Sequence, residues 1–141
     1  MTSLSGVAHV LFVCRQNAGR SQMSQALFER AAAGRHSADS AGTAPAASVH
    51  PEVSDTMLEL GLDLRDRRPK LLTRELAEPA DVVVTMGCGD ECPYIPGKRY
   101  VDWDLADPEG RDADTVRSIR DEIARRVGEL VVELDRQGAA A

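Results

Sequence analysis

Apolar and polar positions along this chain follow two alternating periods, one typical of buried strands and the other of amphipathic helices. Residues 8–13 and 81–86 are mostly apolar and β-branched, which predicts strands buried on both faces. Apolar residues recur at helical spacing elsewhere, and Gly34, Pro51 and Gly61 stand where helices are expected to end or begin. The predicted elements are strands at 8–13, 35–40, 81–86 and 100–103, and helices at 21–33, 51–60, 73–78 and 112–137.

This order of elements predicts a single α/β domain over residues 1–141, in which a four-stranded parallel sheet is flanked by helices on both faces. Functional sites of such sheets lie beyond the carboxyl ends of the strands. The loops that follow Val13 and Met86 leave the two long strands at that end. We therefore expect the chemistry of the chain to gather in these loops.

The first of these loops, CRQNAGRS, carries a cysteine and an arginine with five residues between them. A loop of this length between a strand and a helix can curl around a tetrahedral oxyanion, with backbone N–H groups directed inward. The guanidinium of Arg20 can close the ring with two parallel hydrogen bonds to oxyanion oxygens. Cys14 then lies beneath the central atom, where the positive field favours the nucleophilic thiolate.

Other residues of this loop suit the same role. Gly19 allows close backbone approach, Asn17 tolerates a left-handed conformation, and Ser21 can donate a hydrogen bond to the Cys14 thiolate. Oxyanion binding and loop support are assigned to Arg15, Gln16, Asn17, Ala18, Gly19 and Ser21, together with Arg20. The alternative is an ordinary strand-to-helix turn around an inert buried cysteine.

The second loop, GCGDECPYIPGKRY, contains Cys88 and Cys92 with three residues between them. Two thiols at the same end of the sheet as Cys14 allow a relay, in which Cys88 attacks Cys14 and Cys92 then attacks Cys88. Half of a zinc site and two incidental thiols are the alternatives. Zinc needs four ligands, and no partner pair stands at suitable spacing, so no metal is expected. The histidines are scattered, at His9, His36 and His50.

A third segment, YVDWDLADPEG, contains Asp107 followed by Pro108. A carboxylic acid above the oxyanion loop can protonate a leaving oxygen, and the proline would stiffen the segment. An ordinary Asp-Pro turn is the alternative. Asp102 and Asp104 stand close by, so sequence position alone does not select Asp107.

Composition narrows the function classes. The 141 residues carry a net charge of −6, with a pI near 5.0 and no basic stripe, which argues against nucleic-acid binding. No apolar run approaches the length of a membrane span, and the first residues show no signal-peptide pattern. Three cysteines, an odd number, fit poorly with a secreted disulfide framework. We expect a cytoplasmic protein with reactive thiols.

The loop CRQNAGRS matches the C-x2-N-x2-R-S pattern of the low-molecular-weight protein tyrosine phosphatase fold. Together with GRSQM, SAGT, the paired-cysteine loop and WDLADPEG, it resembles the thioredoxin-coupled arsenate reductases built on that fold. The resemblance covers nearly the whole chain and implies a four-stranded parallel sheet flanked by helices. The side-chain roles that it implies are Cys14 as nucleophile, Arg20 as oxyanion ligand, Asn17 and Ser21 as loop and thiolate supports, Asp107 as general acid, and Cys88 and Cys92 as resolving and shuttling thiols.

Three features depart from these relatives. Cys88 and Cys92 are closer in sequence than the corresponding pair, so their loop is shorter. Glu109 and Gly110 follow the Asp-Pro pair where tyrosine phosphatases carry aromatic residues, which makes phosphotyrosine a poor main substrate. Gln25 stands where some reductases hold a potassium ion with a glutamate, so no bound ion is expected.

The resemblance therefore implies reduction of arsenate to arsenite through a Cys14, Cys88 and Cys92 disulfide relay that thioredoxin re-reduces, with no metal or organic cofactor. Phosphate and sulfate are expected to compete for the loop. The alternatives are a phosphatase acting on phosphate monoesters, a mycothiol-coupled arsenate reductase, and a thiol module that binds arsenite or senses redox state. Weak phosphatase activity is expected as a side reaction, because phosphate and arsenate are similar in size and charge.

Overall fold

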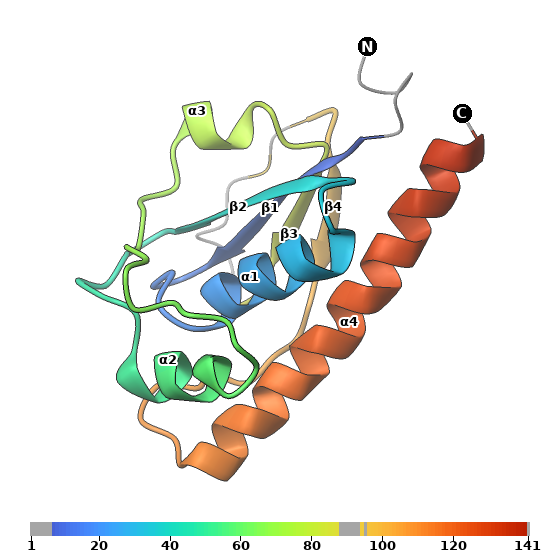
Figure 1. Ribbon diagram of the computed structural model, residues 1–141. Helices are drawn as coiled ribbons and strands as arrows, with labels where there is room; N and C mark the ends of the chain where they lie inside the picture. Colours follow the sequence, from blue (N-terminus) through green and yellow to red (C-terminus); the bar gives the residue numbers. More distant parts are fainter. Residues whose placement is uncertain (1–6, 88–93, 95, 141) are drawn as a thin grey trace.

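The structure is a computed structural model that describes residues 7–87, 94 and 96–140. Strands and helices alternate along most of the chain, as the sequence predicts (Figure 1). The strands are β1 (His9–Cys14), β2 (Ser37–Gly42), β3 (Val82–Thr85) and β4 (Arg99–Asp102), and the helices are α1 (Arg20–Ala32), α2 (Pro51–Leu58), α3 (Arg74–Ala77) and α4 (Ala113–Ala140).

The described strands form one parallel sheet in the order β2-β1-β3-β4, which confirms the predicted four-stranded parallel sheet. β1 lies in the middle, with Cys14 opposite Gly42 of β2 and Val13 opposite Thr85 of β3. Because all four strands run in one direction, the loops after β1 and β3 leave the sheet at the same edge. The backbone N–H of Met86 donates to the Val13 carbonyl (2.8 Å), so the two loops begin side by side.

Helices cover both faces of the sheet, as predicted (Figure 1). α1, α2 and α4 pack on one face, and α3 lies on the other. Side chains of β1 alternate between the two layers, since Phe12 and Cys14 join the larger core and Leu11 and Val13 join the smaller one with Ala77. Burial on both faces explains why β1 is continuously apolar.

Local details agree closely with the sequence prediction, although boundaries shift. β1 extends one residue further than expected, so Cys14 is the last residue of a strand. α1 ends one residue early, at an Ala33 cap with a left-handed φ of 50°. The Thr73 hydroxyl accepts a hydrogen bond from the Leu76 N–H (3.2 Å), as expected for the cap of α3. Within the described residues, no helix combines the length and apolar character needed to cross a bilayer.

Candidate active site

The backbone of residues 14–20, here called the cradle, is hydrogen-bonded along one side to the segment 43–50. Four N–H groups of the segment 43–50 donate to carbonyl groups of the cradle: Thr43 donates to Cys14 (3.2 Å), Ala44 to Arg15 (2.7 Å), Ala46 to Gln16 (2.9 Å) and His50 to Ala18 (3.0 Å). Because these four carbonyl groups already accept hydrogen bonds from the segment 43–50, the arrangement favours a cradle lined by N–H groups, as an oxyanion site requires. Gly19 is the N-cap of α1, and a Cβ atom there would lie 2.9 Å from Pro108 Cγ, so glycine lets the Asp107 segment pack against the cradle.

Cys14 lies at the floor of the cradle, and its side chain is enclosed. Only 1% of the residue is exposed, and its Sγ lies 2.9 Å from Ser21 Oγ and 3.3 Å from the donating N–H of Asn17. Asn17 has a φ of 52°, the left-handed conformation that the sequence analysis expects there. Its Nδ2 donates to Ser21 Oγ (2.7 Å), so the two residues support each other beside the sulfur.

Arg20 stands at the end of the cradle, with its side chain held from two directions. Its Nη1 donates to the Leu105 carbonyl (3.3 Å), and its Nη2 lies 3.6 Å from Asp107 Oδ2. Gly87, with a φ of 84°, leaves the space that the guanidinium fills, because a Cβ atom there would lie 2.1 Å from Nη1. The structure therefore brings Arg20, Asp107 and the start of the second loop together.

Asp107 and Asp102 make different contacts. Asp107 faces Arg20, and its Oδ1 accepts a hydrogen bond from the Glu109 N–H (3.0 Å), which orients the carboxyl group. Asp102 instead accepts from Thr85 Oγ1 (2.7 Å), within the sheet. Half of the Asp107 side chain is exposed, in contrast to the largely buried Arg20 side chain that it faces.

Two carboxylates fasten the Asp107 segment to the rest of the site. Glu109 Oε1 accepts from Gln16 Nε2 of the cradle (3.3 Å), and Glu52 Oε2 of α2 accepts from the Gly110 N–H (2.6 Å). Burial opposes ionisation of Glu52, but backbone hydrogen bonds from Gly110 and from its own N–H, with the nearby charge of His50, lower its pKa. Glu52 is therefore an ionised anchor for this segment.

Cys88 and Cys92, the predicted relay thiols, lie outside the described residues. Their loop begins at Met86 and Gly87, which lie beside the ends of β1 and the cradle. No group of three or more His, Cys, Asp or Glu in the described part of the chain is placed to hold a metal ion.

Three contributors to the site were missed by reasoning from the sequence: the segment 43–50, Glu52 and Gln22. Each makes contacts with residues that are distant in sequence, as the buried Gln22 side chain does with the Arg68 carbonyl. The SAGT sequence ahead of the segment 43–50 is a signal for the first, because it ends β2 beside the cradle. For Glu52 no sequence signal is evident.

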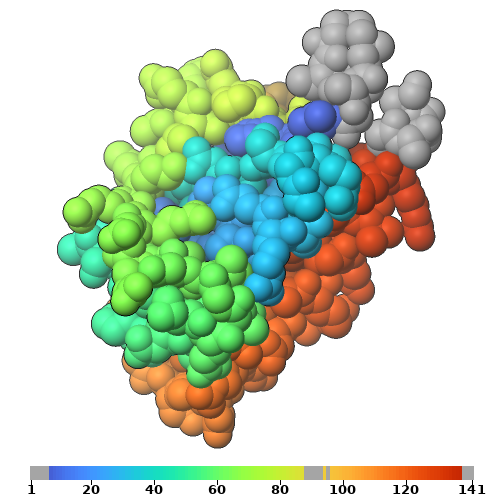
Figure 2. Space-filling model, in the orientation of Figure 1, coloured from blue at the N-terminus to red at the C-terminus, as the bar shows by residue number. Residues whose placement is uncertain are grey.

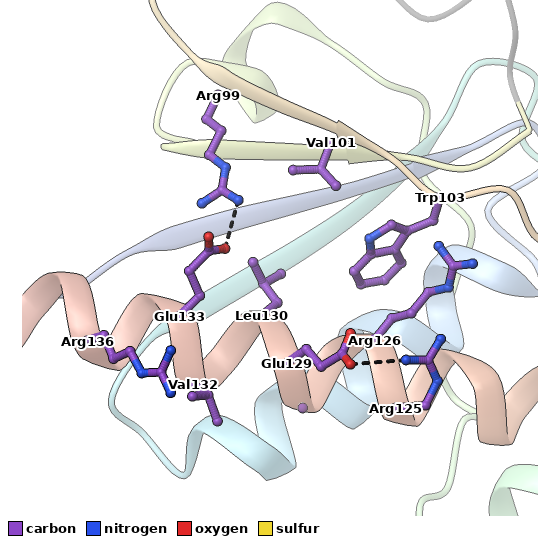
Figure 3. Close-up of a pocket in the computed structure, with 11 residues that line it drawn as sticks. Arg99, Val101, Trp103, Arg125, Arg126, Glu129, Leu130, Val132, Glu133 and Arg136 are labelled. Carbon is purple, nitrogen blue, oxygen red and sulfur yellow. Dashed lines mark hydrogen bonds and ion pairs between the residues drawn. The ribbon is translucent and has the colours of Figure 1, made fainter.

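A separate groove of about 910 Å³ lies between β4 and α4 (Figure 3). Trp103 and Leu130 contribute apolar surface, while Arg99 pairs with Glu133 across the groove (2.7 Å). None of the residues that line it belongs to the cradle, and none is a cysteine or histidine. The groove is therefore separate from Cys14 and Arg20.

The comparison with protein families decides the assignment. Residues 9–140 match the family described as low molecular weight phosphotyrosine protein phosphatase. The chain belongs to this family. The matched region of this chain contains the cradle, Arg20 and Asp107.

Individual members of the low molecular weight phosphatase family are similar over most of this chain. A Halobacterium salinarum protein named "Putative arsenate reductase" is 43% identical over 129 residues, which cover 88% of this chain and 91% of that protein. The thioredoxin-dependent arsenate reductase of Corynebacterium glutamicum is also 43% identical, with a TM-score of 0.80. It covers 92% of this chain, which spans only 62% of the Corynebacterium chain. An arginine phosphatase of Geobacillus stearothermophilus has a TM-score of 0.84 at 26% identity, covering 94% and 96% of the two chains.

Proposed function

We propose that this chain reduces arsenate to arsenite, with Cys14 as the nucleophile. The observation that carries the proposal is the enclosed Cys14 sulfur, which accepts from the Asn17 N–H and lies 2.9 Å from the Ser21 hydroxyl, at the floor of an oxyanion cradle. Two proteins that are 43% identical to the chain are named as arsenate reductases, which supports arsenate over other oxyanions.

The first step forms a bond between Cys14 and arsenic. Arsenate binds to the cradle N–H groups and to the guanidinium of Arg20, which places its central atom above Sγ. The Cys14 thiolate forms an S–As bond while one As–O bond breaks. Asp107 gives its proton to the departing oxygen, which leaves as water when it already carries one hydrogen.

The second step transfers two electrons to arsenic. The Cys88 thiolate attacks Cys14 Sγ, so an S–S bond forms and the S–As bond breaks, with its electron pair left on arsenic. Arsenite is released. Cys92 then attacks Cys88, which frees the Cys14 thiolate and leaves a Cys88–Cys92 disulfide that the dithiol of thioredoxin reduces. The relay is supported by the position of Gly87, where the cysteine loop begins against Arg20.

A coupled assay tests this proposal. Purified chain, arsenate, thioredoxin, thioredoxin reductase and NADPH should oxidise NADPH continuously, and Cys14→Ser, Cys88→Ser and Cys92→Ser should each abolish turnover. A parallel assay contains mycothiol and its reducing enzymes in place of thioredoxin. Full turnover of Cys88→Ser or Cys92→Ser with thioredoxin would contradict the relay. Turnover of the unmodified chain with mycothiol but not with thioredoxin would show that mycothiol is the reductant.

A phosphatase is the second function that the site supports. Phosphate monoester hydrolysis needs only a nucleophile, an oxyanion ligand and an acid, and the contact between Arg20 and Asp107 supplies the last two beside Cys14. The structural similarity to an arginine phosphatase favours the same chemistry. Hydrolysis of a small aryl phosphate should therefore survive Cys88→Ser and Cys92→Ser and be lost in Cys14→Ser. A phosphatase rate that exceeds arsenate turnover would make hydrolysis the main activity.

A further inference from the structure

A buried glutamine contacts the cradle through the side chain of Asn17. Gln22 is in the first turn of α1 and is only 2% exposed. Its Nε2 donates to Asn17 Oδ1 (3.2 Å) and to the Arg68 carbonyl (3.5 Å). Figure 2 shows the segment 51–72, in green, lying beside the blue surface of α1. Gln22 therefore joins this segment to the loop that surrounds Cys14.

Two donors converge on the side-chain oxygen of Asn17. Besides Gln22 Nε2, the backbone N–H of Lys70 donates to Asn17 Oδ1 (2.9 Å). An amide oxygen accepts and an amide nitrogen donates, so this pair of donors fixes which end of the Asn17 amide points toward Ser21. The end facing Ser21 Oγ is Nδ2, at 2.7 Å.

This orientation sets the direction of the hydrogen bond to the sulfur. Ser21 Oγ accepts from Asn17 Nδ2, so its own proton is available for Cys14 Sγ, 2.9 Å away. Gln22, Asn17 and Ser21 then form a chain in which every hydrogen bond donates toward Cys14. Such chains polarise one another inside a protein, and a terminal donor favours the charged thiolate over the thiol.

We infer that Gln22 is a positioning residue for the nucleophile, acting through Asn17 and Ser21. A second observation supports this: the buried Gln22 Oε1 has no hydrogen-bond partner among the described residues. Leaving an amide oxygen buried and unpaired costs free energy, so packing alone would favour an apolar side chain at this position. The inference rests on the proposed role of Cys14 as the nucleophile.

The test measures Cys14 reactivity directly, without arsenate. In a Cys88→Ser/Cys92→Ser background, the rate of alkylation by iodoacetamide is recorded against pH. Gln22→Met keeps the volume and removes the donor, and it should slow alkylation near neutral pH by about tenfold, the scale of one hydrogen bond to a charged group. The rate at high pH, where the thiol is fully ionised, should match the parent. Gln22→Glu places carboxylate oxygen against Asn17 Oδ1 and should have the same effect.

Gln25→Met is the matched control, on the same helix. Gln25 bonds to Ser40 Oγ (2.7 Å) and to the Ala38 carbonyl (3.5 Å) in β2, away from Cys14, so its variant should keep the parent pH profile. A parent-like profile in both Gln22 variants, or an equal shift in Gln25→Met, would overturn the positioning role. A shifted profile in Gln22→Met, combined with no arsenate turnover in the unmodified chain, would support the positioning role and reject the proposed reaction.

Discussion

At the scale of single residues, the place of the Arg20 guanidinium depends on the missing side chain at Gly87. A Cβ atom at Gly87 would lie 2.1 Å from Arg20 Nη1, far inside contact distance. Gly87→Ala should therefore displace the guanidinium and weaken oxyanion binding at least about tenfold, because a charge-assisted hydrogen bond is lost. Equilibrium binding of phosphate or arsenate to the reduced protein measures this effect.

Gly97→Ala is the control that separates the steric clash with Arg20 from the backbone strain of an alanine at positive φ. Gly97 has a φ of 90°, so alanine is strained there as it is at Gly87, but a Cβ atom at Gly97 meets no atom of the described residues within 4 Å. Both variants should lose about 1 kcal/mol of unfolding free energy, and only Gly87→Ala should lose affinity for the oxyanion. Equal affinity in the two variants would show that Gly87 does not set the position of Arg20.

The residues that sequence reasoning found and missed differ in the range of their contacts. Cys14, Asn17 and Ser21 stand within eight consecutive positions, so a short motif describes their geometry. The contacts of Gln22 with the Arg68 carbonyl and of Glu52 with Gly110 join residues far apart in the sequence. Such contacts depend on how loops pack, and hydrophobic periodicity carries no information about that packing.

At the scale of elements, α2 is tied to α4 through one carboxylate. Glu59, at the C-terminal end of α2, accepts hydrogen bonds from Arg117 Nη2 (2.8 Å) and Arg120 Nη1 (2.9 Å) of α4. These bonds, Arg117 first, lower the pKa of Glu59 to about 2 from its usual 4.5. A carboxylate with a lowered pKa stabilises the fold above its unfolded-state pKa and loses that contribution as pH falls toward the folded value.

Glu59→Gln should therefore make the unfolding free energy less dependent on pH in acid. Unfolding free energy from urea titration should fall less steeply in Glu59→Gln than in the parent between about pH 5 and pH 2. At neutral pH the variant should be the less stable, because the two arginines lose a charged acceptor. Asp55→Asn, which removes an exposed carboxylate from the same helix, is the control and should keep the parent slope. Parallel slopes for Glu59→Gln and the parent would show that this carboxylate does not couple α2 to α4 through its charge.

Element type and order were predictable where a segment has a clear hydrophobic pattern, as β1 and α4 do, whereas boundaries depend on neighbours. The strand expected at 35–40 is found at Ser37–Gly42, because its register with β1 places Gly42 opposite Cys14. The helix expected at 51–60 ends at Leu58, where the Leu60 and Leu62 N–H groups both turn back to the Met57 carbonyl. Strand pairing and chain reversal of this kind depend on tertiary contacts, which a local sequence pattern does not reveal.

At the scale of the whole molecule, the parallel sheet gathers residues from distant parts of the chain at one edge. The strand order places the end of β1, with Cys14, beside the end of β3, where Met86 bonds to Val13 and the cysteine loop begins. The Asp107 segment follows β4 and reaches back to Arg20. Cys14, Arg20, Asp107 and the start of the cysteine loop thus converge through topology, which is the basis of the proposed relay.

A single turnover with arsenate tests that relay most directly. Reduced Cys92→Ser, mixed once with excess arsenate and no reductant, should release about one arsenite per chain, because one pair of thiols supplies two electrons. Peptide mapping under non-reducing conditions should recover a Cys14–Cys88 disulfide, whereas Cys88→Ser should yield little disulfide and little arsenite. Recovery of mainly Cys14–Cys92 from the unmodified chain would reverse the roles of the loop cysteines. Absence of arsenite from the fully reduced, unmodified chain, or arsenite formed by Cys92→Ser without any disulfide at Cys14, would contradict the proposed reaction.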